Sequence, residues 1–550
     1  MKSKWFVLFG MCFVLLGIFA GCQKAPPEEP PIPDNVLFYM KSTNLEATWD
    51  KITTTKLSQD IKNLEIWNNP FVKQAFSEME DAFKEAEEQM GIPINKQTFM
   101  AVFGKRFDMA IVPGPAVPYG IFIADMSTKA TGLKILDYIQ KEAGSANVRT
   151  EKYKNQEFTV VNSDDDMNLA YFFSGDRLIF TTDIEAAKMC ADILAWEKPL
   201  FFESDKYKGL SESMKSQDDL MYIDIRAIID TYKAAVPDDL KMQLENIDYD
   251  QIIVGSKWNE KGLTGAVELH YPSTSKFLTL FGDSKLTGET ARWIPENPLF
   301  ANGGAIKFQE LYDVQKTKIQ KLGEIAGKDV WDEIDKELQQ ELNISLDQDI
   351  RPWLGDGAFL SIHRVNSQGT IPMPETVIGI GIKDKSKAEA FVNKIQEMIT
   401  DEFGSRHLKF QTLDIDGMQY HYVPLPFGPN IMPGYLLTDN FLVLATSQTG
   451  ITDSIKAYKG ETNNFTDSKA FKDIESLQSG KTIGFQYWNN KQLMTSLSDL
   501  INNYRMFFPE EINPDQVQAA LNSLGSIEDL YSDIEVDQNR MNSSFQMTIK

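Results

Sequence analysis

Short runs rich in apolar residues and bounded by turn-forming residues recur along most of this chain, and they predict β-strands. Such runs lie at residues 107–112, 158–161 and 169–173, and a pair of them at 252–271 encloses the turn sequence Asn259-Glu260-Lys261-Gly262. Strands joined by short turns predict largely antiparallel sheets, with helices packed on one face of each sheet. The predicted fold class is therefore α+β.

Residues 72–90 have helical spacing instead. Apolar residues recur there at steps of four and three, in the order Val72, Phe76, Met79, Phe83, Ala86 and Met90. This spacing places them in one stripe on an otherwise acidic helix, and we expect the stripe to pack against the sheet of its own domain. The alternative is a groove for an acyl chain or a partner helix, since Met and Phe adapt to varied apolar partners. The candidate ligand-binding residues are then Val72, Phe76, Met79, Phe83 and Met90.

The first 21 residues are arranged as a signal peptide. Lys2 and Lys4 precede an uncharged apolar run at residues 5–20, which is shorter than the roughly 20 residues needed to cross a bilayer. Phe19-Ala20-Gly21-Cys22 resembles the bacterial lipobox, in which a lipidated cysteine becomes the new N-terminus. We therefore expect Cys22 to carry acyl chains such as palmitate. The alternative is an ordinary signal peptide, in which Cys22 is a chance thiol.

Residues 22–33 are predicted to form a proline-rich tether. Prolines favour the extended polyproline II conformation, and at about 3.1 Å per residue the segment would hold the folded part roughly 30 Å from the lipid. Plain disorder would serve the same purpose. Gln23 after the lipidated cysteine favours the outer membrane if the host has two membranes.

The chain also resembles itself at a long period, which predicts two tandem repeats at residues 34–273 and 294–550. The block at residues 170–210 aligns without a gap on residues 434–474. Residues 153–161 match 415–423, the opening at 33–38 matches 295–300, and Gly120-Ile121-Phe122-Ile123-Ala124-Asp125 is paired with residues 379–384. The blocks keep the same order in both halves, although exported α+β chains share generic patterns that could imitate such a repeat.

Several of these motifs together resemble a known family. They are the opening P-x-N-V-L-F-Y at residues 33–39, the strand G-I-F-I-A-D, the strand pair A-Y-F-F-S-G-D-R-L-I-F-T-T-D and the segment F-x-x-S-x-x-Y at 201–207. The chain is similar to exported bacterial proteins of the family called domain of unknown function 3352. The resemblance covers most of the chain after Pro33. It implies an uncharacterised protein of the cell envelope, and it implies no catalytic residue.

Charge and cysteine content narrow the classes of function. With 79 acidic against 55 basic residues the formal charge is −24, which argues against nucleic acid as a partner. Of the 3 cysteines, Cys12 leaves with the signal peptide and Cys22 is acylated, so Cys190 has no disulfide partner in the mature chain. Its neighbours recur at helical spacing, and we expect a buried, unreactive thiol there.

Motifs that would indicate catalysis or metal binding are weak in this sequence. The histidines His270, His363, His407 and His421 have no partner at metal-ligand spacing, and we expect strand positions for His363 and His421. The cluster Asp164-Asp165-Asp166 could bind calcium but fits a solvated turn better. The sequence lacks a P-loop and a G-x-S-x-G elbow. We therefore assign no catalytic residue, no metal site and no cofactor.

These observations predict a lipid-anchored protein of the cell envelope that binds or scaffolds rather than catalyses. The membrane, through the N-terminal lipid, is one partner, and an envelope protein or polymer is a possible second one. One alternative is a carrier of a lipid or another apolar ligand in the periplasm or at the surface. A second alternative is an envelope hydrolase without a recognisable motif.

Overall fold

The computed structural model of the 550-residue chain describes residues 28–62, 70–103, 106–115, 117–126, 128–143, 147–162, 168–234, 236, 247–282, 285–366, 372–403, 409–425, 431–477, 482–505, 513–537 and 539–549. Its described residues divide into two compact units, unit 1 up to His270 and unit 2 from Tyr271. Each unit is considered by itself. The predicted signal peptide, Cys22, His407 and the aspartates at 164–166 lie outside the described residues.

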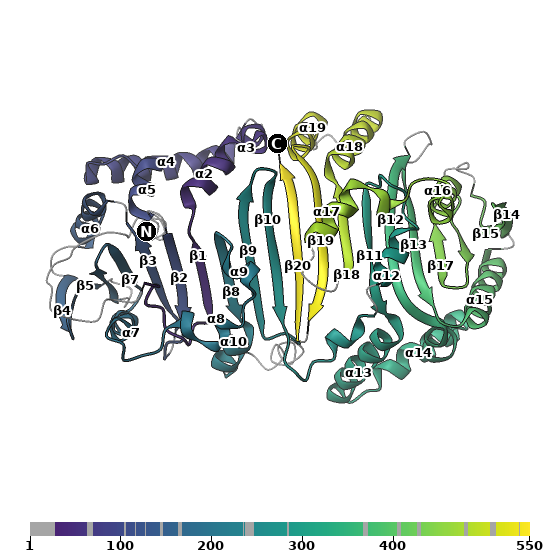
Figure 1. The fold of residues 1–550 in the computed structure, drawn as a ribbon, viewed down its shortest axis with the longest axis horizontal. Coiled ribbons are helices and arrows are strands. Elements are labelled where there is room, and N and C mark those ends of the chain that lie inside the picture. Colours follow the sequence, from purple (N-terminus) through teal and green to yellow (C-terminus); the bar gives the residue numbers. More distant parts are fainter. Residues whose placement is uncertain are drawn as a thin grey trace. The chain divides into compact units, whose positions relative to one another are not determined.

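Unit 1 is built on one antiparallel sheet (Figure 1). Its strands are β1 (Phe38–Ser42), β2 (Arg106–Val112), β3 (Tyr119–Asp125), β4 (Val148–Tyr153), β5 (Gln156–Asn162), β6 (Asn168–Ser174), β7 (Arg177–Thr181), β8 (Asp219–Asp224), β9 (Gln251–Asn259) and β10 (Gly262–His270). They pair in the order β10-β9-β8-β1-β2-β3-β7-β6-β5-β4, and every pair is antiparallel. This confirms the antiparallel sheet predicted from strands joined by short turns.

The helices of unit 1 lie on both faces of this sheet. They are α2 (Leu45–Thr54), α3 (Lys56–Lys62), α4 (Pro70–Met90), α5 (Lys96–Phe103), α6 (Lys129–Ala143), α7 (Ile184–Leu194), α8 (Asp205–Lys208), α9 (Glu212–Lys215), α10 (Ile225–Tyr232) and the short 3-10 helix η3 (Phe201–Glu203). On β7, Ile179 packs in the cluster that contains α7, whereas Leu178 and Phe180 pack in the cluster of α4, α5 and α6. The prediction of helices on one face was wrong, because neighbouring side chains of these central strands are buried on opposite sides.

Unit 2 has a sheet with the same order of strands. They are β11 (Phe300–Lys307), β12 (Leu354–Asn366), β13 (Met373–Ile382), β14 (Gln411–Ile415), β15 (Met418–Tyr422), β16 (Gly434–Leu437), β17 (Phe441–Ala445), β18 (Thr482–Asn489), β19 (Ile527–Asp537) and β20 (Arg540–Ile549). They pair as β20-β19-β18-β11-β12-β13-β17-β16-β15-β14, again with every pair antiparallel. Raising each strand number of unit 1 by ten reproduces this order.

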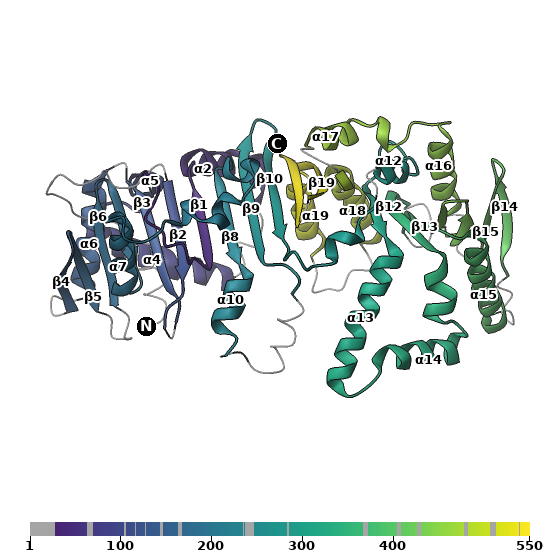
Figure 2. The same ribbon diagram turned by 60° about the horizontal axis from the view of Figure 1, so that its bottom comes forward.

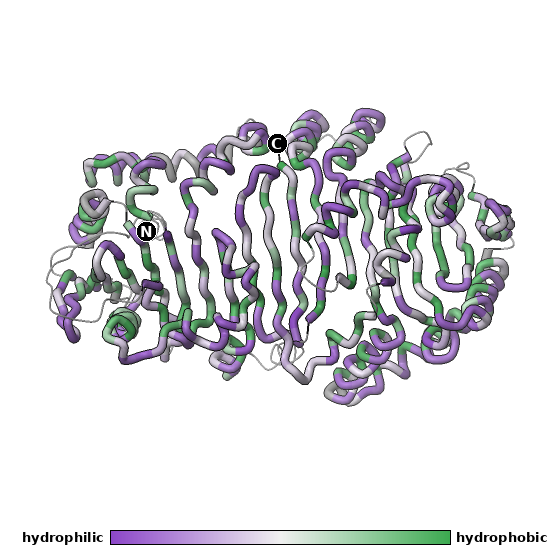
Figure 3. Tube along the Cα trace, viewed as in Figure 1, coloured by the Kyte–Doolittle hydropathy of each residue, from purple (hydrophilic) through white to green (hydrophobic). Residues whose placement is uncertain are grey.

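Helices again cover both faces in unit 2. They are α12 (Lys285–Ala291), α13 (Phe308–Ala326), α14 (Val330–Leu342), α15 (Lys385–Phe403), α16 (Gln448–Lys459), α17 (Lys469–Leu477), α18 (Asn490–Tyr504) and α19 (Pro514–Leu524), with short helical turns at Phe277–Leu280, Leu346–Ile350, Arg351–Trp353 and Phe465–Asp467. One core lies beneath α16 and α17, and a second lies beneath α15. Figure 2 shows α13 and α14 standing out from the sheet. Figure 3 shows hydrophobic positions interleaved with hydrophilic ones along the strands.

The last part of the predicted tether belongs to the folded body of unit 1. Residues 30–33 are buried, and Ile32 is a member of the core beneath α7. The Phe201 amide donates a hydrogen bond to the Ile32 carbonyl (2.9 Å), and Pro33 forms a bridge with Leu200. The prediction of a free spacer that extends to residue 33 was therefore wrong. The apolar side chain of Ile32 and a β-type contact hold the segment in place.

Candidate functional site

The apolar stripe of α4 ends in the core of unit 1. Ala86 and Met90 are buried together with residues of α5, α6 and the sheet, and Phe83 is half-buried. The structure does not describe the side chains of Val72, Phe76 and Met79. Packing against its own domain therefore holds at the C-terminal end of the stripe, and the ligand-binding role of the stripe stays a prediction.

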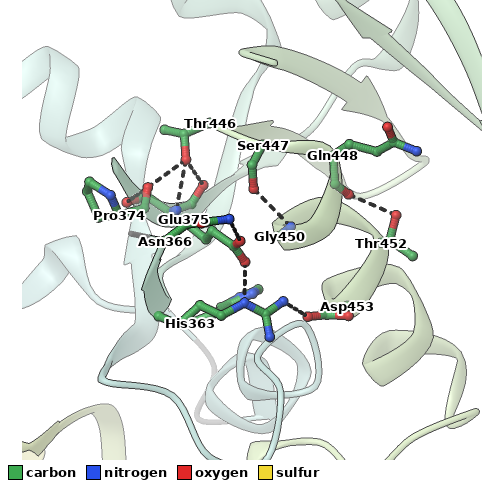
Figure 4. Close-up of polar contacts among 12 residues, drawn as sticks. His363, Asn366, Pro374, Glu375, Thr446, Ser447, Gln448, Gly450, Thr452 and Asp453 are labelled. Atoms are coloured by element: carbon green, nitrogen blue, oxygen red, sulfur yellow. Dashed lines mark hydrogen bonds and ion pairs between the residues drawn. The ribbon is translucent and has the colours of Figure 1, made fainter. Parts of the chain in front are cut away.

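His363 belongs to a polar cluster in unit 2, part of which Figure 4 shows. Its side chain projects from β12 beneath α16, where its Nε2 atom is 3.0 Å from the Ser361 hydroxyl and 3.4 Å from the Ser454 hydroxyl. Its Nδ1 atom has no partner among the described residues. Burial, and secondarily the charge of Arg364, lowers the pKa of His363 to about 3, so the imidazole is neutral at physiological pH.

Charged residues close this cluster at its rim. Glu375 on β13 is buried and accepts a hydrogen bond from Arg364 Nε (2.7 Å), while Arg364 Nη2 reaches Asp453 on α16 (2.6 Å). Asn366 donates a further bond to Glu375 (3.3 Å). The network joins β12, β13 and α16, and the buried neutral His363 faces serines rather than an open surface. This arrangement suits a structural role better than proton transfer to a substrate.

Two further histidines have structural partners on strands. His270 on β10 lies 3.1 Å from Glu268, which also accepts a hydrogen bond from Ser211. His421 on β15 stacks on Tyr435, with ring centroids 5.1 Å apart, and contacts the hydroxyl of Thr412. Burial lowers the pKa of His421. His363 and His421 thus occupy the strand positions expected from the sequence.

A cavity of about 450 Å³ opens at the start of β12 in unit 2. Its lining comes from α12, α13, β12, β13 and the β16–β17 turn, and comprises Glu289, Gln309, Glu310, Leu354, Gly355, Asp356, Ile382, Lys383, Asn440 and Phe441. A bulge between Leu354 and Ala358 shapes one wall. Gly357 has a φ of 88°, and a side chain at Gly381 would collide with the Asp356 carbonyl at 1.9 Å, so both positions require glycine.

The charges of this cavity are mainly negative. Glu289, Glu310 and Asp356 line it together with the single cation Lys383, which donates to Gln309 (3.3 Å). Burial, and secondarily the charge of Glu310, raises the pKa of Asp356. Such a lining suits a polar or cationic group better than the acyl chain of a lipid. Sequence reasoning missed this cavity, because its residues come from five separate elements.

In unit 1, a chain of polar contacts links the core to the N-terminal segment. The Tyr39 hydroxyl donates to the buried Asp108 carboxylate (2.6 Å), and Arg106 Nε contacts the same carboxylate (2.8 Å). Arg106 Nη1 reaches Glu29 (2.7 Å). Burial raises the pKa of Asp108, although Arg106 opposes that shift. Arg177 holds the carbonyls of Glu28 and Glu29 (2.8 and 3.1 Å).

Three of the remaining expectations concern cysteine, metals and the membrane. Cys190 on α7 is buried, and burial raises the pKa of its thiol, as expected for an unreactive cysteine. Within the ranges that the structure covers, no three His, Cys, Asp or Glu side chains gather as metal ligands. Among the helices of those ranges, none has the length and apolar character to span a bilayer.

Comparison with known proteins gives one family. The family described as "Protein of unknown function (DUF3352)" matches residues 262–526, which lie mostly in unit 2. The chain therefore resembles this family, as predicted, over that range. The motifs at 33–39, 120–125 and 170–183 precede the matched range. We expected the resemblance mainly in the first half of the chain, and the family model matches mainly the second half.

Other comparisons add little. No curated protein matches the chain. A solved structure titled "Structure of crystal form IV of TP0453" aligns with 8% sequence identity and a TM-score of 0.24, covering 44% of this chain and 80% of that one. A likeness at this TM-score supports no conclusion about fold or function.

Proposed function

We propose that this protein is a lipid-anchored component of the cell envelope that binds or scaffolds an envelope protein or polymer without catalysis. The observation that carries the proposal is the packing of helices on both faces of each sheet. Four apolar clusters fill these faces, two in each unit, with side chains from the sheets and helices. Filled cores favour a binding module over a carrier with an apolar interior.

The proposed location of the protein follows from its first 22 residues. Acylation of Cys22 would attach the mature chain to a membrane far more firmly than one reversible acyl chain does. In a host with two membranes, Gln23 favours the outer membrane. The cavity of unit 2, with its three carboxylates, offers a place for a cationic group of an envelope partner.

We further propose that the two units are copies of one ancestral α+β repeat. The identical strand order supports this, and so do matching contacts. The Phe201 amide donates to Ile32 (2.9 Å) as the Phe465 amide donates to Ile294 (2.7 Å). Ser204 and Ser468 each donate to a phenylalanine carbonyl three residues earlier, at 2.6 Å in both units.

One block of the sequence alignment needs correction. The Gly120 amide donates to the Thr182 hydroxyl (2.8 Å), and the corresponding bond in unit 2 is from the Thr376 amide to the Thr446 hydroxyl (2.9 Å). Under this proposal, Gly120 corresponds to Thr376 and not to Gly379. A shift of three residues would exchange the two faces of the strand, which the buried clusters do not allow.

The proposed lipid anchor is tested by replacing the sulfur atom of Cys22 with oxygen. In Cys22→Ser the acceptor thiol is lost, so we expect the protein to leave the membrane pellet and to shift on a gel. Mass spectrometry of the wild-type N-terminus should give the mass of an acylated cysteine. As a control, Cys190→Ser keeps the anchor and should sediment normally. Sedimentation of Cys22→Ser equal to wild type would contradict the anchor.

The binding role is tested on native envelopes. Chemical crosslinking of the anchored protein should yield a reproducible partner, and Glu310→Lys should weaken that crosslink if the unit 2 cavity takes part. Asp537→Lys, an exposed charge reversal outside the cavity, is the matched control. Steady release of soluble envelope fragments by the purified protein would instead favour the hydrolase alternative.

A further inference from the structure

The structure limits how far unit 1 can stand from the lipid to which Cys22 is attached. Arg177 and Arg106 hold Glu28 and Glu29 on the sheet, so the chain is fixed from Glu28 onwards. Six residue steps separate Cys22 from Glu28, and even a fully extended chain covers only about 22 Å in six steps. The lipid surface is therefore close to the place where Glu28 is bound.

This place is at one end of the unit 1 sheet. Arg106 begins β2 and pairs with Asp125, which in turn pairs with Arg177 at the start of β7. Ser42, the last residue of β1, lies opposite Phe107. Helix α2 begins three residues after Ser42, and Figure 1 shows it at this end of the strands.

Helix α2 carries apolar side chains that unit 1 leaves uncovered. It has no buried residue over Leu45–Thr54. Trp49 is 41% exposed and Ile52 is 49% exposed, and their spacing of three residues places them on the same face. A helix of this length without fully buried residues gains little from packing within unit 1, so a surface that covered this face from outside would stabilise it.

The exposed face is connected to the strand end by a row of aromatic rings. Trp49 contacts Phe99 on α5 (5.9 Å between ring centroids), Phe99 contacts Phe103 (4.2 Å), and Phe103 contacts Phe107 on β2 (5.5 Å). Lys96 and Asp50 form an ion pair beside the row. Trp49 is thus braced against the same strand whose Arg106 holds Glu29.

We propose that the Trp49–Ile52 face of α2 rests on the lipid surface to which Cys22 is anchored. The short leash brings this end of the sheet to the membrane, and tryptophan favours the interface between acyl chains and water. The strong acidity of the chain makes neutral lipid the better partner. This inference rests on the lipid anchor proposed above.

The test uses single thiol labels on the lipidated protein in phosphatidylcholine vesicles. A fluorophore is attached at Ile52→Cys, and quenching by nitroxide-labelled lipid is measured. The matched control is Val117→Cys, an exposed apolar position (65%) in the β2–β3 loop, which lies at the opposite end of β2, about 20 Å along that strand from Arg106. The buried Cys190 does not compete for label.

We expect at least twofold stronger quenching at position 52 than at position 117. Trp49→Cys serves as a second label on the same face and should behave like position 52. Equal quenching at positions 52 and 117 in protein that still sediments with vesicles would overturn this inference and leave the anchor intact. Shielding of position 52 in lipid-free protein of dimeric mass would also overturn it, in favour of a second copy. If mass spectrometry finds no acyl group on the protein, the proposed lipid anchor would be contradicted instead.

Discussion

The side chains beneath α16 differ in polarity from those at the corresponding place beneath α7. If the two units are aligned as proposed, Ser361, His363 and Ser454 occupy the positions of Ala110, Val112 and Cys190. In unit 1 those three residues are part of an apolar core. Unit 2 has instead buried a histidine whose Nδ1 atom is unpaired within the described structure. An unpaired buried polar atom costs stability, so this difference is open to measurement.

We expect His363→Ala to lower the free energy of unfolding by about 2–4 kcal/mol, because it leaves a cavity and removes the partner of two buried hydroxyls. The triple variant Ser361→Ala, His363→Val, Ser454→Cys should cost less, since it removes all the polar groups together. Urea unfolding followed by circular dichroism compares the two. A triple variant as unstable as His363→Ala would contradict this account of the cluster.

A buried carboxyl on β19 should make stability depend on pH. Burial, and secondarily the charge of Glu535, raises the pKa of Asp533 to about 7 from its ordinary value of 3.8. The folded state therefore binds more protons than the unfolded state between these values, and this group reduces stability as the pH rises from 4 to 7.

We expect Asp533→Asn to be increasingly more stable than wild type as the pH rises, by a few kcal/mol at pH 8 and by little at pH 4. Urea unfolding at both values gives the difference, in which the contributions of carboxyls that do not interact with Asp533 cancel. Asp537→Asn, an exposed carboxyl on the same strand, is the control and should show no such trend. A constant difference for Asp533→Asn would show that the carboxyl titrates normally.

At the scale of elements, the N-terminal segment at residues 28–33 packs against unit 1 as part of its folded body. Its proline content favours an extended chain, which is also the conformation needed to pass along a sheet and bury Ile32. Composition alone does not distinguish a free extended chain from a packed one. The buried contacts of Ile32 and the two arginines make that distinction.

Ile32→Ala should destabilise unit 1 by about 2–4 kcal/mol through the loss of buried methyl groups. Glu29→Gln should cost under about 1 kcal/mol, because this glutamate is 44% exposed and its ion pair with Arg106 is partly screened by water. Thermal unfolding of both variants separates the effect of burying Ile32 from the effect of the Glu29–Arg106 ion pair. Equal, small effects would mean that the segment is a free tether after all.

Strand and helix positions were largely predictable from the sequence. The apolar runs at 158–161 and 252–271 correspond to β5 and the β9–β10 hairpin, and the stripe at 72–90 lies in α4. Helices on both faces were foreseeable from one signal, the uninterrupted apolar run Leu169-Ala170-Tyr171-Phe172-Phe173 in β6. A continuous run is typical of a strand buried on both sides, whereas alternation indicates one buried face.

At the scale of the whole molecule, each unit has its own pair of apolar cores. The clusters of unit 1 contain only residues before 271, and those of unit 2 only residues after 290. We therefore expect residues 271–550 alone to unfold in one cooperative transition with dispersed amide signals by NMR. A chain that stays unfolded when expressed alone would contradict this independence.

The amino-acid sequence by itself determined the acidity of the protein, its α+β class and the resemblance to one family, because each depends on local order or on composition. The tertiary structure decided which strands are buried on both faces, that Ile32 belongs to the core of unit 1, and which residues form the unit 2 cavity. These depend on contacts between residues far apart in the chain, and periodicity within one segment carries no information about such contacts.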